Sequence, residues 1–185
     1  MDMKEMLFEK RIDGEVKYSG KIVTVVKDKI ELPDGNTSYR EVVRKNGGVC
    51  VVALTDNNEV VFVNQFRYPY GKVLKEIPAG KLEKNEDPLE CGIRELSEET
   101  GYTAGKIIPL GEFYPSCGIM DEVLYMYLAT DLKLGKVHLD EGEFLTSEKI
   151  PLDDAVQMIL NGELADGKTQ IAILKTWALK QKGAI

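Results

Sequence analysis

Three glutamates stand close together in the middle of the chain, at Glu95, Glu98 and Glu99. In a helix they would occupy positions i, i+3 and i+4 and share one side. Gly101 marks the expected end of that helix, so the three charges would oppose the negative end of the helix dipole. A divalent cation such as Mg²⁺ or Mn²⁺ prefers carboxylate oxygens and would reverse this penalty. The pattern favours a metal site, and a solvated acidic helix face is the alternative.

The helix that carries these glutamates has recognisable ends. Asp87 suits the N-cap, Pro88 the first helical position and Gly101 the left-handed position after the last turn. Gly92 would let a loop or a ligand approach the helix backbone. An apolar stripe at helical spacing predicts the face that packs on the core: Leu89, Ile93, Leu96 and Thr100.

The composition is that of an ordinary globular protein of one domain with a modest extension. The chain has 185 residues, 43% of them hydrophobic and 30% charged. Its net charge of -7 argues against attraction to nucleic acid or to an anionic membrane. No apolar run approaches the roughly 20 residues of a membrane span, and the first residues lack the apolar region of a signal peptide. We therefore expect a cytoplasmic protein.

Cysteine and histidine are too sparse to carry the chemistry. Cys50, Cys91 and Cys117 form no CxxC pair, so neither a zinc ribbon nor a redox motif is indicated. Cys50 lies in an apolar run and is expected in the core. His138 is the single histidine, and its flanks predict an exposed loop. The chemistry must therefore depend on carboxylates, lysines or metals.

The remaining sequence predicts a mixed α/β fold. Turn signals at Asp13-Gly14 and Asp34-Gly35 divide the first 45 residues into short antiparallel strands. Later apolar runs predict strands at 48–54, 59–66, 105–114 and 122–130, and helices at 152–160 and 169–182. Because the strands do not alternate regularly with helices, an antiparallel or mixed sheet is expected in place of a doubly wound one.

At this point the residues resemble a known family. Gly80, five residues, Glu86, seven residues and then the run Arg94–Tyr102 resemble the signature of Nudix hydrolases. Every fixed polar and glycine position matches, and Tyr102 replaces the usual aliphatic residue. The resemblance implies an α/β/α sandwich and metal-assisted hydrolysis of a nucleoside diphosphate linked to another moiety.

The same resemblance implies roles for residues of the signature. The metal-ligand candidates are Glu95, Glu98, Glu99 and the backbone carbonyl of Ala79, and they would hold two or three Mg²⁺ or Mn²⁺ ions. Glu98 and Glu99 are also catalytic candidates. Structural or orienting roles fall on Gly80, Gly101 and an ion pair between Glu86 and Arg94.

The resemblance extends along most of the chain to the ADP-ribose pyrophosphatase branch. It rests on Gln65-Phe66-Arg67, on Glu76–Gly80, and on Tyr114–Gly118 with Pro115. Cys117 stands where relatives usually have a proline, which leaves the fine substrate preference open. Downstream, the acidic segment 139–155 resembles the loop that supplies the base in this branch.

In that acidic segment Glu141 is the candidate general base and Glu143 an additional metal ligand. Asp140 is a second candidate for the base, and a solvated acidic loop is the alternative interpretation. Candidate substrate-binding residues are Arg40, Arg67, Lys81, Ser116, Gly118 and Glu122. The two arginines would bind phosphates or the terminal ribose, with surface ion pairing as the alternative. The adenine-stacking group remains open among Tyr18, Lys21 and Ile22.

The sequence therefore predicts an Mg²⁺-dependent enzyme that hydrolyses ADP-ribose to AMP and ribose 5-phosphate. A hydrolase of another nucleoside diphosphate sugar, such as GDP-mannose, and a non-hydrolytic ADP-ribose sensor are the alternatives. Residues 1–45 are expected to form an N-terminal antiparallel β extension that builds a homodimer, and residues 46–185 the Nudix domain. An extra sheet on a monomer is the competing interpretation of the extension. The expected partner is a small molecule, not nucleic acid or membrane.

Overall fold

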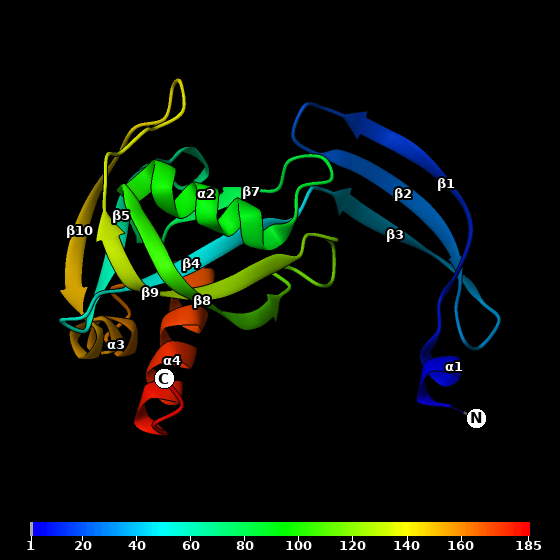
Figure 1. Cartoon of the computed structure of the whole chain (residues 1–185). Coiled ribbons are helices and arrows are strands. Elements are labelled where there is room, and N and C mark those ends of the chain that lie inside the picture. Colours follow the sequence, from blue (N-terminus) through cyan, green and yellow to red (C-terminus); the bar gives the residue numbers. More distant parts are fainter. Residues whose placement is uncertain (1) are drawn as a thin grey trace. The chain divides into compact units, whose positions relative to one another are not determined.

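The computed structural model describes residues 2–185, which form two compact units (Figure 1). One unit contains the chain up to Asn46 together with Tyr114–Glu122, and the other contains Gly47–Phe113 and Val123–Ile185. The expected division after residue 45 did not include the second segment of the first unit.

The first unit contains a three-stranded antiparallel sheet, which confirms the expected antiparallel β extension, and a short helix that the sequence analysis did not predict. The strands pair in the order β1-β2-β3. A parallel bridge between Val43 and Met120 joins segment 114–122 to the end of β3. The elements are α1 (Met3–Leu7), β1 (Lys10–Ser19), β2 (Thr24–Glu31) and β3 (Thr37–Arg44).

The turn expected at Asp13-Gly14 is wrong, because β1 continues through both residues. Gly14 pairs with Asp28, and a Cβ atom at position 14 would lie 2.0 Å from Asp28 Oδ1. The glycine thus makes room for the buried carboxylate of Asp28, which accepts a hydrogen bond from Arg11 Nε at 2.9 Å. The chain turns later, where Gly20 N–H donates to the carbonyl of Val23 at 2.9 Å.

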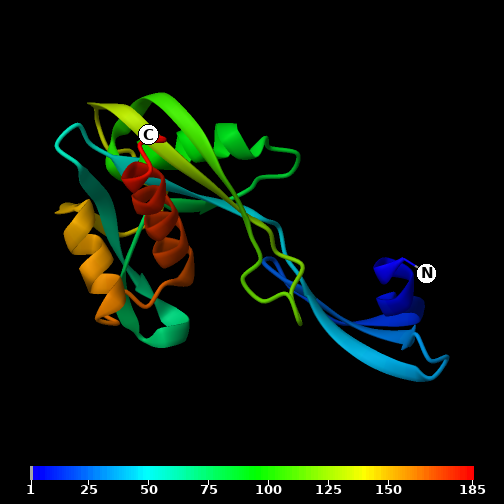
Figure 2. The same cartoon turned by 90° about the horizontal axis from the view of Figure 1, so that it is seen from below.

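The second unit is built on a seven-stranded mixed sheet (Figure 2). Its main order is β10-β5-β4-β9-β8, with β6 beside β5 and β7 beside β4. The β4–β9 pair is parallel and the others are antiparallel. The strands are β4 (Gly48–Leu54), β5 (Glu59–Arg67), β6 (Lys72–Glu76), β7 (Ala79–Lys81), β8 (Tyr102–Phe113), β9 (Leu124–Leu134) and β10 (Leu145–Pro151); a 3₁₀ turn, η1 (Tyr68–Tyr70), joins β5 to β6.

Helices cover both faces of this sheet, which confirms the expected α/β/α sandwich. Strand β4 is buried along its whole length and alternates between two cores. Val51 and Ala53 face the core beneath α2 (Pro88–Thr100), where Leu96 packs. Cys50 and Val52 belong to the opposite core, with residues of α3 (Leu152–Leu160) and α4 (Gly167–Gln181).

The face that α2 presents to the sheet differs from the expected apolar stripe. Leu96 is fully buried, but Leu89 and Ile93 remain 39% and 38% exposed. The buried face of α2 instead includes Gly92, where a Cβ atom would lie in ordinary contact with the ring of Tyr127, at 3.4 Å. Glu99 belongs to this buried face, and only 2% of its surface is exposed.

Candidate functional site

The acidic turn of α2 is held by well-formed helix ends. The Asp87 carboxylate accepts hydrogen bonds from the N–H groups of Leu89 and Glu90 at 2.9 and 3.2 Å. Gly101 adopts a left-handed conformation with φ +73°, and its N–H donates to the carbonyl of Ser97. These two caps fix both ends of the helix that carries the three glutamates.

Strand β7 supports the carboxylates from the other side. The N–H of Ala79 donates to Glu99 Oε2 at 3.0 Å. At Gly80, an added Cβ atom would lie 1.8 Å from the carboxyl carbon of Glu95. Glycine at position 80 is therefore required for Glu95 to lie against the strand backbone.

Burial and mutual repulsion make two of these carboxyl groups hard to ionise. Burial raises the pKa of Glu99 to about 8, and the charges of Glu143 and Glu95 act in the same direction. The Ala79 N–H and the charge of Arg67 partly oppose this rise. Burial also raises the pKa of Glu95, against the charge and hydrogen bond of Arg94.

Arg94 is the cation that holds the outer side of the cluster. Its Nε and Nη2 donate to the two oxygens of Glu86 at 2.9 and 3.2 Å, which is the pair expected from the sequence. Its Nη1 also donates to Glu95 at 2.9 Å and to Glu98 at 2.8 Å. The hydrogen bond from Arg94 holds the pKa of Glu86 at about 2.

The acidic loop is tied to the same helix. His138 is exposed, but its backbone N–H donates to the carbonyl of Glu98 at 3.1 Å. Further along, Gln65 Nε2 donates to Glu143 Oε1 at 3.2 Å. Glu143 is half-buried and its charge acts on Glu95 and Glu99, whereas Glu141 is exposed.

The donor set of this cluster fits a divalent cation. Glu95, Glu99 and Glu143 supply hard oxygen ligands, and their mutual repulsion is the term that a cation would remove. Within residues 2–185, no three acidic, cysteine or histidine side chains already converge as a ready-made metal site. Arg94 contacts one oxygen of Glu95 and one oxygen of Glu98, so it does not hold the second oxygen of either carboxylate.

Arg67 belongs to the same electrostatic neighbourhood. Its Nε and Nη2 donate to the two oxygens of Glu76 at 2.6 and 2.7 Å, and its charge is felt at Glu99. Lys81, the other substrate candidate in this unit, is exposed, and its backbone carbonyl accepts a weak hydrogen bond from Cys91 Sγ.

The other four substrate candidates lie in the first unit: Arg40, Ser116, Gly118 and Glu122. Arg40 Nε donates to Glu9 at 2.9 Å. The carbonyl of Ser116 accepts hydrogen bonds from two N–H groups of its own loop, and Gly118 has open space where a side chain would lie. Glu122 is buried and pairs with Lys45.

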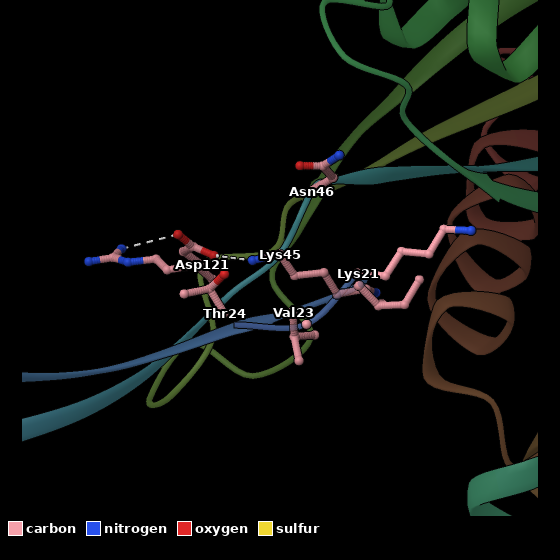
Figure 3. Close-up of a pocket in the computed structure, with 9 residues that line it drawn as sticks. Lys21, Val23, Thr24, Lys45, Asn46 and Asp121 are labelled. Carbon is pink, nitrogen blue, oxygen red and sulfur yellow. Dashed lines mark hydrogen bonds and ion pairs between the residues drawn. The ribbon is translucent and has the colours of Figure 1, made fainter. Parts of the chain in front are cut away.

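The first unit also contains a pocket of about 380 Å³ (Figure 3). Lys21 and Ile22, two of the three adenine-stacking candidates, line it, whereas Tyr18 does not. Asp121 closes one side and accepts hydrogen bonds from Arg44 at 3.1 Å and from the backbone of Lys45 at 3.0 Å. The full lining is Gly20, Lys21, Ile22, Val23, Thr24, Arg44, Lys45, Asn46 and Asp121.

Three residues that contact this machinery were not singled out as site residues from the sequence. Gln65 was noted only as part of the resemblance, yet it reaches Glu143. Cys91 accepts a hydrogen bond from Arg94 at 3.3 Å, and Lys168 contacts Glu76. Lys168 is 92 residues from Glu76 along the chain, so no local spacing could have revealed that contact.

Comparisons with known proteins identify relatives over most of the chain. A protein of Bacillus subtilis (strain 168) named ADP-ribose pyrophosphatase is 43% identical over 90% of this chain and 91% of its own length. A protein of Bacillus methanolicus named methanol dehydrogenase activator is 44% identical over 92% of this chain and 94% of its own.

A solved structure described as an ADP compounds hydrolase shares the fold, with a TM-score of 0.85. It covers 96% of this chain and 97% of its own at 19% identity, a level that supports the fold alone. Among residues 2–185, no helix has the length and apolar character needed to cross a membrane.

The model of the NUDIX domain matches residues 44–171, which include the whole acidic cluster. Together with the two relatives above 40% identity, this match establishes that the chain belongs to the Nudix family.

Proposed function

We propose that this protein hydrolyses the diphosphate of ADP-ribose to AMP and ribose 5-phosphate with the help of Mg²⁺. The observation that carries the proposal is the electrostatic coupling of the buried Glu99 to Glu95, to Glu143 and to the guanidinium of Arg67. These carboxylates would repel an anionic diphosphate, so the substrate can bind beside them only if cations lie between the two.

The residues that would hold Mg²⁺ or Mn²⁺ are Glu95, Glu98, Glu99, Glu143 and the backbone carbonyl of Ala79, with two or three ions in the loaded site. When bound, the cation polarises a phosphoryl oxygen and lowers the pKa of a water molecule. Glu99 and Glu95 are suited to this role because their ionised forms are destabilised in the free protein.

The remaining steps belong to the side chains. Glu141 is exposed on the acidic loop and would take the proton from the attacking water as a new P–O bond forms. The bridging P–O bond then breaks, which leaves AMP on one side and ribose 5-phosphate on the other. Arg67 has donors beyond those bound to Glu76, and these would bind and orient a phosphate.

ADP-ribose is favoured over other nucleoside diphosphates by the relative named ADP-ribose pyrophosphatase, at 43% identity. In the first unit, the pocket lined by Lys21 and Ile22 offers an apolar and a cationic group that would suit a nucleobase. GDP-mannose hydrolysis and non-hydrolytic sensing remain the alternatives, and the intact acidic signature disfavours the sensor.

A substrate panel tests the proposal. ADP-ribose, GDP-mannose, NADH and diadenosine polyphosphates are incubated with protein and Mg²⁺, and phosphate is measured after phosphatase treatment. We expect kcat/KM to be highest for ADP-ribose and activity to disappear in EDTA. Preferred hydrolysis of GDP-mannose would reject the substrate but keep the metal chemistry. If no diphosphate is hydrolysed, the non-hydrolytic ADP-ribose sensor becomes the favoured function.

A homodimer forms part of the proposal. The β1–β3 sheet exposes apolar side chains to an extent that calls for a covering surface, among them Val16 at 62%, Tyr18 at 58% and Tyr39 at 57%. A second copy of the chain would cover them. Arg40 would then lie near the partner's site, after exchanging its contact with Glu9 for substrate.

A second candidate function comes from the relative named methanol dehydrogenase activator, at 44% identity. In this alternative the chain would stimulate a methanol dehydrogenase. The test is the rate of methanol oxidation with and without the chain, using Glu99→Gln to separate hydrolysis from binding. Stimulation by the wild type and not by Glu99→Gln would show that hydrolysis is required.

A further inference from the structure

A buried carboxylate lies directly behind Arg67 and plays no part in the steps described above. Glu76, the last residue of β6, has 1% of its surface exposed. Arg67 donates to both of its oxygens, and Lys168 Nζ donates to Oε2 as well. Burial alone would raise the pKa of Glu76, but these two cations hold it below the ordinary value. Glu76 is therefore an ionised interior group with two cationic partners.

Lys168 is itself held in place by the beginning of α4. Its Nζ donates to Asp166 Oδ2 at 3.0 Å, and Asp166 caps the helix by accepting from Thr169 N–H at 3.0 Å and from its hydroxyl at 2.6 Å. Thr169 Oγ1 in turn accepts from the N–H of Ile77 at 3.0 Å. The first turn of α4 is thus joined to the residue that follows Glu76.

Glu76 is the most buried member of this chain of contacts, and Arg67 is the most exposed. The exposed fraction of the side chain is 2% for Glu76, 11% for Lys168 and 36% for Arg67. Glu76 thus links Lys168 to Arg67, the most exposed residue of the chain, whose charge acts on Glu99. A movement of Glu76 would be passed to Arg67 through two parallel hydrogen bonds.

Charge balance explains why a second cation is needed. Glu76 and Asp166 are matched by Arg67 and Lys168, so the four charges cancel. Without Lys168, the charge of Arg67 alone would offset both carboxylates as well as the field of Glu99. Little of it would then be available to an anionic substrate.

We propose that Lys168 is a positioning residue, which fixes Glu76 so that the Arg67 guanidinium is both oriented and electrostatically available for the substrate diphosphate. This inference rests on the proposed function for its kinetic consequence. Its structural consequence, the immobilisation of Arg67, does not depend on which substrate is turned over.

The test compares Lys168→Met with Lys168→Arg, which keeps the charge, and with Lys175→Met as a control. Lys175 lies on the same helix and donates to the carbonyl of Leu110, away from the cluster. We expect Lys168→Met to raise KM for ADP-ribose about tenfold with little change in kcat, as for a lost charged contact in substrate binding. Lys168→Arg, which keeps the charge, should have a KM close to that of the wild type. Lys175→Met should also have the wild-type KM.

A second measurement follows Arg67 directly in the full-length protein by the NMR signal of its Nε–H. This proton should exchange with water faster in Lys168→Met than in the wild type, in Lys168→Arg or in Lys175→Met. If Lys168→Met does not fold, Lys168→Gln removes the charge and keeps a donor. Unchanged exchange and unchanged KM would overturn the proposal and leave the cluster a purely structural one. If the wild type hydrolyses no diphosphate, the proposed function fails while the exchange result still decides this inference.

Discussion

The backbone N–H of Ala79 donates a hydrogen bond of 3.0 Å to the buried carboxylate of Glu99. This contact joins the start of β7 to the last turn of α2, the two elements expected to provide metal ligands. The hydrogen bond favours the ionised form of Glu99, but burial and the neighbouring acids outweigh it and raise the pKa to about 8. In the free protein the ionised form of Glu99 is therefore disfavoured, and a bound cation would stabilise it.

Replacing Glu99 with glutamine should separate activity from stability. We expect Glu99→Gln to lower Mg²⁺-dependent kcat by more than about 100-fold, since a catalytic metal contributes several kcal/mol to the transition state. In EDTA the melting temperature should stay the same near neutral pH and rise above about pH 8, where Glu99 ionises and the change removes its repulsion with Glu95 and Glu143. Glu90→Gln, at an exposed position of the same helix, is the matched control. Unfolding of Glu99→Gln with a normal rate in the remaining enzyme would indicate a structural role.

The stability of the metal-free protein should depend on pH through the same group. The pKa of Glu99 is raised from 4.5 to about 8, so between these values the folded state holds a proton that the unfolded state has released. The free energy of unfolding should therefore fall as pH rises through this window, and the contribution should level off on either side. Urea denaturation in EDTA across the window measures it. Glu99→Gln should show a shallower decline and Mg²⁺ should offset it; parallel curves for the two proteins would contradict the assignment.

The acidic loop should supply the base and one ligand. Glu141→Gln is expected to lower kcat by about 10²–10⁴-fold with little change in substrate affinity. Glu143→Gln should instead raise the Mg²⁺ concentration needed for half-maximal activity, because this side chain acts on Glu95 and Glu99. Steady-state kinetics at several Mg²⁺ concentrations distinguish the two effects. If Glu141→Gln turns over at the normal rate, the general base must be reassigned to Asp140, to Glu143 or to a residue of helix α2.

The N-terminal strands should be needed for assembly and for full activity. Deleting residues 1–36 is expected to give a monomer with greatly weakened ADP-ribose turnover. In the full chain, Val16→Asp places a charge on the exposed apolar sheet and should weaken the dimer without shortening the protein. Light scattering after gel filtration measures the mass. A monomeric wild type, or a truncated monomer with the full rate, would show that the strands are dispensable.

The sequence predicted the elements that local patterns determine. The helix expected at 152–160 has those bounds in the structure, and Cys50 lies in the core as expected. The turn predicted at Asp13-Gly14 was wrong because an Asp-Gly pair looks the same in the sequence whether it forms a turn or lies within a strand. Here the glycine makes room in the strand for the carboxylate of Asp28. The spacing of Leu89 and Ile93 could not show that Gly92 and Glu99 would be buried while these two apolar side chains stay partly exposed.

The acidic residues of the site were visible because helical spacing and the family signature place them together. Their electrostatic state was not, since it depends on burial against strands far away in the sequence. Glu76 and Lys168 show the limit most clearly: an ion pair across 92 residues has no periodicity, and each residue alone looks like an ordinary surface charge.

The most direct test of this account is the binding of Mn²⁺ to the protein without substrate, followed by the electron paramagnetic resonance signal of the free ion. We predict that the wild type binds Mn²⁺, that Glu90→Gln binds it equally well, and that Glu99→Gln weakens binding by at least about tenfold. Equal Mn²⁺ affinity in the wild type and Glu99→Gln, or no binding by the wild type, would contradict the assignment of the acidic turn as the metal site.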